Sequence, residues 1–419
     1  MKTKLFLLIT ASLFSLTVYS QGWFEQPTGL PAGNVLYGVW FVNANTGFIS
    51  GGTSSSRVIK KTTDGGNSWF NVYFEPDPAT FFSLQFLNET TGFVYGYESE
   101  VFRTTNAGAN WDLIYIGANG VYSGEFLDYN TGIISGFNYN SSNIHKTTNA
   151  GSNWTTLNTP LVGQHFLFQV FFRNSNLAFL SSSSYTTSVP NILRTSDGGA
   201  NWSFVYTGTA SQVAFKIADI NSDTMITVGQ AGSILRTYNA GLNWSNSSFG
   251  SYNLNGITMR NNLIAYAVGE NVIIKTANTG SNWTVQYTPS SNLQAVFFLN
   301  DQTGWACGSQ GKLFKTTNGG ATAIHINGNT IPDKFSLSQN YPNPFNPFTN
   351  IKFDIPFSSI VKLIIYDLHG REINILVNEE LTPGAYEVNW NASNNPSGVY
   401  FYRLTAGDFS RTKKMVMIK

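Results

Sequence analysis

Two short acidic segments in the first part of the chain each bring two carboxylates close together in the sequence. They are Glu75-Pro76-Asp77 and Glu98-Ser99-Glu100. Paired carboxylates hydrolyse glycosidic bonds, and some glycosidases use a tyrosine nucleophile instead. Both segments fall in expected loops, where solvated or weakly cation-binding roles are the simpler interpretation. We therefore assign no catalytic residue and keep glycoside hydrolysis as the alternative function.

Tyrosines in polar segments are the second group with useful chemistry. Tyr97, Tyr139 and Tyr185 stand among Ser, Asn and Gly residues, between expected second and third strands of a repeated unit. Tyrosine with serine and asparagine suits adaptable recognition, as in antibody loops. We predict these three tyrosines as ligand-binding residues, against the alternative of ordinary solvated loops.

Charge and motif content exclude several function classes. The net charge is +1, charged residues make up 11% of the chain, and no Lys/Arg cluster occurs, which disfavours nucleic acid as a partner. No HExxH, CxxC, P-loop or GxSxG motif is present, so we expect neither metal nor cofactor. The single cysteine, Cys307, lies in an apolar run and is expected to be buried and inert.

The N-terminus has the pattern of a secretory signal peptide. Lys2 and Lys4 precede an apolar run of about 14 residues that ends near Ser20. A membrane anchor is the alternative, but a span needs about 20 apolar residues. We predict residues 1–20 as a signal peptide and no transmembrane segment in the mature chain.

An internal repeat determines the expected fold. The segment Thr62–Trp69, TTDGGNSW, returns in related form ending at five further tryptophans, with steps of 42, 43, 48, 42 and 39 residues. A seventh copy has Ala323 in place of tryptophan. The period fits four short strands, the size of one β-propeller blade. Each copy follows a Lys or Arg, which we interpret as a repeated scaffold contact.

The missing seventh tryptophan indicates how the ring closes. Trp23 lies upstream of the first repeat, in a segment that resembles the outer strands. We expect this N-terminal strand to complete the seventh blade, which leaves only short, protected edges. An open array with a degenerate last repeat is the alternative. The predicted propeller covers residues 21–327.

These turns resemble the Asp-box, or bacterial neuraminidase repeat, in the version found in photosystem II assembly (stability) factor-like propellers. The resemblance implies structural roles for the turn residues, away from the ligand face. They are Asp64, Trp69, Asn106, Trp111, Asn149, Trp154, Asp197, Trp202, Asn239, Trp244, Asn278, Trp283 and Asn318.

Sialidases, which also carry Asp-boxes, bind their substrate's carboxylate with three arginines. Outside the slot before each turn, the propeller has only Arg57, Arg173 and Arg260. The last two follow the first strand of their repeats and look like scaffold variation, which weakens the hydrolase alternative.

The pattern changes after about residue 327. Residues 328–334 read as a linker, and residues 335–419 alternate in short strands expected at 351–355, 361–366, 387–390, 399–404 and 413–418. This predicts a small immunoglobulin-like β-sandwich. A stand-alone binding sandwich is one interpretation of it.

The segment also resembles the type A C-terminal sorting domain of the type IX, or Por, secretion system. The matching residues are Pro342, Asn343, Pro344, Asp367, Gly370, Arg371, Gly384, Tyr386, Gly398 and Tyr400. The resemblance implies a Bacteroidetes bacterium, export through the periplasm, contact with the secretion machinery, and release or display at the outer surface. A photosystem role conflicts with this tail, so we expect an exported, non-enzymatic binding, scaffold or adhesion module for a glycan or protein ligand.

Overall fold

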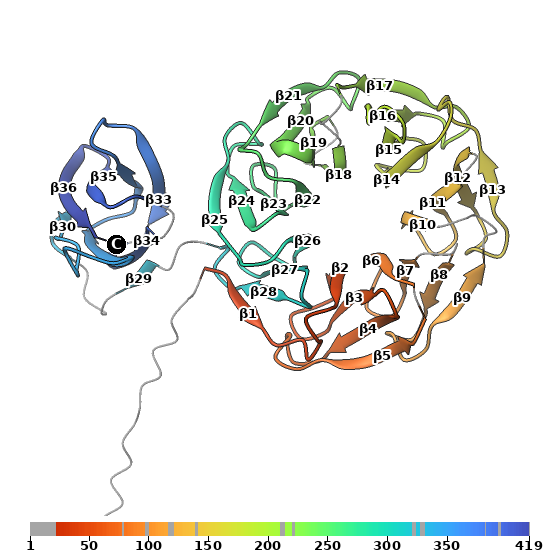
Figure 1. The fold of residues 1–419 in the computed structure, drawn as a ribbon, viewed down its shortest axis with the longest axis horizontal. Helices are drawn as coiled ribbons and strands as arrows, with labels where there is room; N and C mark the ends of the chain where they lie inside the picture. Colours follow the sequence, from red (N-terminus) through yellow and green to blue (C-terminus); the bar gives the residue numbers. More distant parts are fainter. Residues whose placement is uncertain are drawn as a thin grey trace, which may run out of the picture. The chain divides into compact units, whose positions relative to one another are not determined.

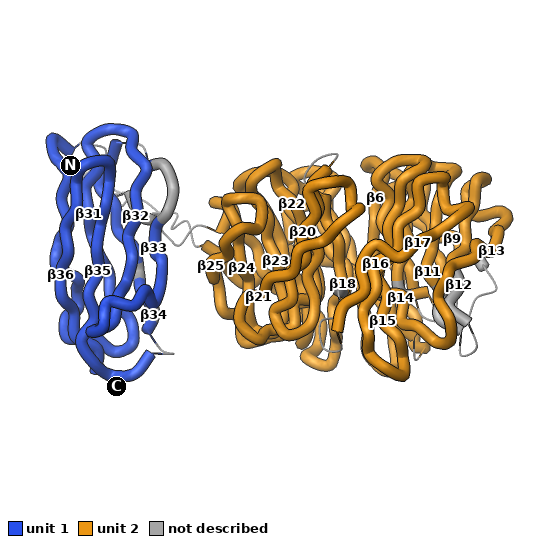
Figure 2. The backbone as a smooth tube through the Cα atoms, turned by 90° about the horizontal axis from the view of Figure 1, so that it is seen from above, with its two compact units in different colours: residues 1–21, 322–419 blue, residues 22–321 orange. Residues whose placement is uncertain are grey.

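The structure, a computed structural model, contains two compact units, Gly22–Ala321 and Thr322–Lys419 (Figure 2). It describes residues 22–77, 79–96, 100–115, 121–138, 141–209, 214–219, 223–320, 324–326, 332–381, 383–392 and 395–418. Within these ranges every regular element is a strand except one 3-10 turn, η1 (Gln230–Gly232), and no helix is long and apolar enough to cross a bilayer. The prediction of an all-β protein is confirmed. The predicted signal peptide lies outside the described residues.

The first unit is a ring of seven four-stranded antiparallel sheets (Figure 1). The first four are β2 (Val35–Phe41), β3 (Gly47–Thr53), β4 (Ser56–Thr62), β5 (Phe70–Glu75); β6 (Phe81–Phe86), β7 (Gly92–Gly96), β8 (Glu100–Thr104), β9 (Asp112–Tyr115); β10 (Val121–Phe126), β11 (Gly132–Asn138), β12 (Ser141–Thr147), β13 (Thr155–Leu157); and β14 (His165–Phe172), β15 (Ala178–Ser184), β16 (Pro190–Thr195), β17 (Ser203–Thr207).

The other three sheets complete the ring. They are β18 (Ala214–Asp219), β19 (Met225–Gly229), β20 (Ser233–Thr237), β21 (Ser245–Ser248); β22 (Leu254–Met259), β23 (Ala265–Gly269), β24 (Val272–Thr276), β25 (Thr284–Tyr287); and β26 (Leu293–Phe298), β27 (Gly304–Gly308), β28 (Leu313–Thr316) with β1 (Phe24–Gln26). The first strand of each blade lies nearest the centre and the fourth on the rim (Figure 1).

The N-terminal strand closes the ring, as predicted. β1 pairs antiparallel with β28, with Phe24 opposite Lys315. The Trp23 ring is buried and meets Phe298 edge-on at 5.7 Å between centroids. Trp69 meets Phe41 in the same way at 5.9 Å in the first blade. A strand from the start of the chain thus supplies the tryptophan that the last repeat lacks.

Stacked aromatic rings join several pairs of neighbouring blades. Phe126, at the end of β10, stacks on Phe93 of the preceding blade with centroids 3.7 Å apart. Phe41 stacks on Trp305 at 3.5 Å, which joins the first blade to the seventh. Such pairs add to the apolar area that each joint buries. The propeller core therefore lies between its sheets.

The second unit is a sandwich of two four-stranded sheets. One contains β29 (Ile324–Ile326), β34 (Gly384–Asn391), β31 (Phe348–Ile355) and β30 (Ser336–Leu337); the other contains β33 (Glu372–Leu381), β32 (Ser359–Tyr366), β35 (Gly398–Ala406) and β36 (Phe409–Met417). Its core includes Phe353, Leu363, Trp390 and Tyr402.

Three strands of this sandwich, β29, β30 and β33, are absent from the sequence-based expectation. The two-residue β30 pairs with β31. β33 pairs with β32 through two register shifts, which break the alternation that marks a strand. β29 pairs with β34, so residues 324–326 join the sandwich, whereas the repeat pattern set the propeller boundary at residue 327.

Candidate functional site

Side chains of the repeated turn hold it together. In the first copy, the Thr62 hydroxyl donates to Asp64 Oδ1 at 2.7 Å, and the N–H of Ser68 donates to the same oxygen at 2.9 Å. In the second copy, Asn106 Oδ1 accepts the corresponding N–H, also at 2.9 Å. An amide oxygen and a carboxylate oxygen therefore accept the same hydrogen bond in this turn. Equivalent N–H bonds occur at Asn149, Asp197, Asn239 and Asn278, and Asn318 Oδ1 accepts the Thr316 hydroxyl at 3.0 Å.

The two acidic turns carry shifted carboxyl groups. Hydrogen bonds from Ser68 and Thr62 lower the pKa of Asp64 to about 2, and those from Asn201 and Thr195 lower that of Asp197 to about 2. Both carboxylates are acceptors within their own turns. The Asp64 and Asp197 carboxylates therefore have a structural role.

The tryptophans after these turns pack between blades. Trp111, Trp154 and Trp244 each meet a phenylalanine edge-on, at 6.2, 6.1 and 6.4 Å between centroids. Trp202 and Trp283 are buried in clusters that contain residues of two adjacent blades.

The basic residue before each turn binds the next blade. Lys61 Nζ donates to the carbonyl of Ala107 at 2.8 Å, and Lys315 Nζ donates to Gly65 at 2.8 Å across the closure of the ring. The other five bonds run from Arg103 to Ala150, Lys146 to Gly198, Arg194 to Ala240, Arg236 to Thr279 and Lys275 to Gly319. The prediction of a repeated scaffold contact is confirmed.

All seven repeated turns lie on one face of the propeller. Each donates a backbone N–H to the turn between the first and second strands of its own blade; Gly65 N to Asn45 O, at 2.8 Å, is the first of them. Because strand direction alternates, the loops between second and third strands lie at the opposite face. We call that opposite face the loop face.

Of the three predicted tyrosines, the structure describes Tyr185, which lies between β15 and β16 at the loop face. Tyr97 and Tyr139 lie outside the described residues. Tyr185 follows β15, is 55% exposed, and its ring lies 5.3 Å from that of Phe166 at the start of β14. Phe166 stacks near Phe168 at 6.1 Å, and Phe168 meets Phe215 edge-on at 5.0 Å. A row of four aromatic rings thus runs from Tyr185 to β18.

A β-bulge occurs at the same place in the first strand of every blade. Each strand shifts register against the second strand by one residue, in the half nearer the loop face. The extra residues are Tyr37, Phe82, Tyr122, Phe168, Phe215, Asn255 and Gln294. Bulges re-aim side chains and occur often beside functional sites.

The bulged side chains line the middle of the ring. Two cavities, each of about 200 Å³, share Lys216 and Gln294 in their walls. Tyr37 lines the first, and Phe82, Phe168, Phe215 and Asn255 line the second. The side chain of Tyr122 lies outside the description. We call these joined cavities the channel site.

Lys216 is the cation of the channel site. Burial lowers its pKa to about 8, and no hydrogen bond or opposite charge within the described residues offsets that burial. The ammonium group is still protonated at neutral pH. An unpaired cation in an aromatic surrounding is a candidate binding group.

The pairing of β18 with β19 corrects the register read from the sequence. The repeat pattern aligns Ala214 with Gly38, Ser83, Ser123, Gly256 and Ala295, and it ends the first strand of the fifth blade at Ile217. The structure aligns Lys216 with these small residues and ends β18 at Asp219. The two registers differ by two residues and therefore keep the same alternation, so only the strand pairing distinguishes them.

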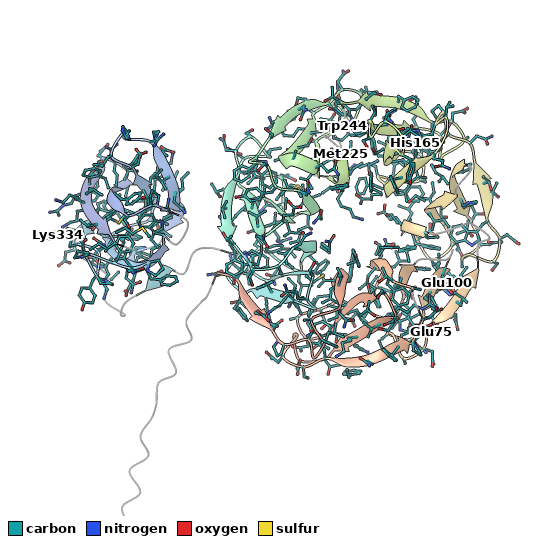
Figure 3. The ribbon with its side chains drawn as sticks, in the orientation of Figure 1. Glu75, Glu100, His165, Met225, Trp244 and Lys334 are labelled. Carbon is teal, nitrogen blue, oxygen red and sulfur yellow. The ribbon has the colours of Figure 1, made fainter. Side chains whose placement is uncertain are left out.

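Each acidic segment has one glutamate in a strand, whereas Asp77 lies after β5, outside any strand, as predicted. Glu75 ends β5, Glu100 begins β8, and both bind the buried guanidinium of Arg57 (Figure 3). Bonds from Tyr73 and Arg57 lower the pKa of Glu75, whereas burial raises the pKa of Tyr73 to about 12. These shifts oppose the needs of a catalytic acid and of a tyrosine nucleophile, because neither group titrates toward neutral pH.

The three arginines outside the repeated slot lie apart. Arg57 binds the two glutamates, Arg173 binds Asp219, and Arg260 binds Asp301, each beside a different pair of blades. They form no common carboxylate-binding group. Cys307 is fully buried, as predicted, and burial raises the pKa of its thiol. Within the described ranges no cluster of metal-binding side chains occurs.

Most of the predicted sorting residues gather at one end of the sandwich. Phe345 exchanges backbone hydrogen bonds with the last strand, and Asn343 Oδ1 accepts the N–H of Val416 at 2.9 Å. The turn after β32 is held by Asp367, which accepts Arg371 Nε at 2.6 Å. Also at this end lie Pro342, Pro344, Gly370, Gly398 and the buried Tyr400. Gly384 and Tyr386 lie opposite Ile355 and Phe353, toward the other end.

Comparison with known proteins assigns both parts of the chain. The family model described as photosynthesis system II assembly factor YCF48 matches residues 18–187, and that of the secretion system C-terminal sorting domain matches residues 339–419. No curated protein sequence matches the chain.

Solved structures support the fold. YCF48 bound to a D1 peptide has a TM-score of 0.58 at 17% identity, covering 71% of this chain and 97% of that one. YCF48 from Cyanidioschyzon merolae gives 0.55 at 18% identity, with 70% and 98% covered. PorZ, a surface component of the type IX secretion system of Porphyromonas gingivalis, gives 0.53 at 15% identity, with 94% and 61% covered. At these identities the likeness concerns fold alone.

Proposed function

The chain carries a YCF48-type BNR repeat domain and a C-terminal Por secretion sorting domain, and on that premise we propose that it is an extracellular binding module whose ligand enters the channel site from the loop face. The sorting domain indicates secretion or surface display through the type IX system.

The observation that carries the binding proposal is the bulge in every first strand. Six of the seven bulged side chains line the channel site, and four of these are aromatic. Aromatic side chains supply large contact area at low entropic cost, and they stack on flat ligand surfaces. The row from Tyr185 to Phe215 extends this surface from the loop face to the channel.

The repeated turns support the same choice by elimination. Their acidic, amide and basic groups all bond to backbone or to each other, as described above. The buried Arg57–Glu75–Glu100 group is likewise occupied by its own partners. A ligand would have to displace these bonds, whereas the channel site offers aromatic faces and an unpaired cation.

For export, we propose that the machinery contacts the sandwich end that holds Asn343, Asp367 and Arg371. Tyr341 is 80% exposed there, and the Arg371 side chain is exposed. The mature propeller is then either released or retained on the surface. The D1 peptide of the YCF48 structure belongs to that protein, but it makes peptides a necessary class in any ligand screen.

The test is a panel of immobilised glycans and peptides offered to the mature chain, with retention and released product measured together. We expect retention without product, and weaker retention of Tyr185→Ala. Product that disappears when Glu75→Gln is introduced would instead establish the hydrolase alternative. A panel that retains nothing would contradict the binding function.

A further inference from the structure

We infer that Lys216 is the anion-binding group of the channel site and that the ligand is an acidic glycan, whose sugar carboxylate pairs with the Lys216 ammonium while its ring lies on the neighbouring aromatic faces. This inference rests on the proposed binding function.

Lys216 has no evident structural role. At the equivalent position five other blades have small residues, Gly38, Ser83, Ser123, Gly256 and Ala295. A Cβ added at Gly38 would come within 2.4 Å of Ser50 Oγ and 2.8 Å of Leu84 Cβ, so space at this register is short. The fold therefore does not need a long cation here, and partial burial of an unpaired ammonium opposes stability.

The strand that carries Lys216 is fixed in place. Gln169, the remaining residue at this register, accepts the N–H of Ile217 through Oε1 at 2.6 Å. That bond ties β18 to the preceding blade next to Lys216. On the other sides stand Phe168 and Phe215, which meet edge-on, and the Gln294 side chain. The cation thus has a fixed base, aromatic walls and a nearby amide.

The surroundings favour a sugar acid over the other anionic ligands. A nucleic acid strand needs several cations along its backbone, and Lys216 is the one cation in the walls of the two described cavities. An extended peptide would pair with a regular strand edge, but every inner strand is interrupted by a bulge. Cavities of about 200 Å³ suit single sugar rings, and aromatic faces with an amide and one charge suit a hexuronate.

The experiment compares two probes that differ in charge and otherwise only in one methyl group per sugar. Calorimetry on the full mature chain would measure binding of a galacturonic acid hexamer and of its fully methyl-esterified form. We expect the acid to bind at least tenfold more tightly. Lys216→Met should remove this difference, Lys216→Arg should keep most of it, and Lys362→Met, an exposed lysine of the sandwich, should change nothing.

Each outcome separates the inference from the proposed function. Equal binding of acid and ester, or a preference that survives Lys216→Met, would overturn the role of Lys216 while leaving a binding module. Binding of polyglutamate but of neither sugar would overturn the glycan assignment in the same way. Thermal melting of Lys216→Met shows whether the variant is folded, and Lys216→Arg keeps the test valid if it is not.

Discussion

The repeated turns and the first strands both recur in all seven blades of this propeller, but they differ in what is kept from blade to blade. At the outer turns both geometry and chemistry recur: each basic residue reaches the next blade and each Asp or Asn accepts the same bonds. At the inner strands the bulge recurs seven times, while the bulged side chain changes from tyrosine to phenylalanine to amide. Residues that support the fold keep their type from blade to blade. The bulge keeps its backbone geometry but varies its side chains, which is where ligand recognition can reside.

The largest expected effect concerns the scaffold. Trp23→Ala should destabilise the propeller by about 3–5 kcal/mol, because a buried indole that joins the last two blades is lost. Tyr185→Ala, which removes an exposed ring, is the matched control and should change stability little. Denaturant unfolding of both variants checks this, and equal stabilities would show that the ring does not depend on its N-terminal strand.

The second expected effect on stability concerns Glu125, in the first strand of the third blade. In the preceding blade, Gln85 donates to Phe126 O at 2.9 Å and accepts Phe126 N at 2.8 Å. Glu125 accepts Phe172 N at 2.5 Å, and burial raises its pKa to about 8 from the ordinary 4.5. A protonated Glu125 can both donate and accept a hydrogen bond, as Gln85 does, whereas an ionised Glu125 can only accept.

The sign of this pH dependence follows from the raised pKa. Between about pH 4.5 and pH 8 the unfolded chain has lost this proton and the folded chain has kept it, so stability falls as pH rises. Glu125→Gln should remove that fall and stabilise the protein by ~2 kcal/mol above pH 8, with no gain below pH 4. The buried Tyr95 faces this group. Unfolding curves across this range decide it, and parallel profiles would contradict the prediction.

A third comparison sets two lysines against each other. Lys315→Met should cost about 1–2 kcal/mol, because its bond to Gly65 and its position over Trp305 close the ring. Lys216→Met should instead stabilise the fold by ~1 kcal/mol, since it removes an unpaired, partly buried cation. Melting temperatures of the two variants at one pH give the answer. A loss at Lys216 equal to that at Lys315 would make both of them scaffold residues.

The smallest effect is expected at the acidic turns. Asp64→Asn should leave the melting temperature at pH 7 unchanged, because five turns already hold asparagine. The lowered pKa of Asp64 contributes stability above about pH 4 that is lost as pH falls toward 2, and the variant should lack this loss. Melting curves at pH 2, 4 and 7 test it. A large loss at pH 7 would show that the carboxylate has a role beyond the turn.

The sequence predicted the outer turns well because each of them is local. Four residue types within eight positions determine the turn: a hydroxyl, an acid or amide, a glycine and a tryptophan. The absence of the seventh tryptophan predicts that Trp23 takes its place. The sorting domain was predictable for the same reason. The place of Lys216 in the channel site was not predictable, because a shift of two residues in β18 leaves the alternation unchanged and only the pairing with β19 sets the register.

Long-range pairing explains the other differences. Arg57 meets Glu75 on the neighbouring strand of its own blade and Glu100 across the joint to the second blade, and no spacing rule contains these contacts. β29 has its partner in β34, some sixty residues away. Tertiary contacts of this kind require the fold before they can be assigned.

The central claim is that the channel site binds the ligand and that the repeated turns stabilise the propeller. Retention of three proteins on the same panel of immobilised polysaccharides tests it most directly: the wild type, Phe168→Ala in the channel site, and Asp197→Asn in a turn. We predict that Phe168→Ala loses the retention of the wild type and that Asp197→Asn keeps it. Retention lost by Asp197→Asn and kept by Phe168→Ala would place the binding surface on the opposite face and contradict the account.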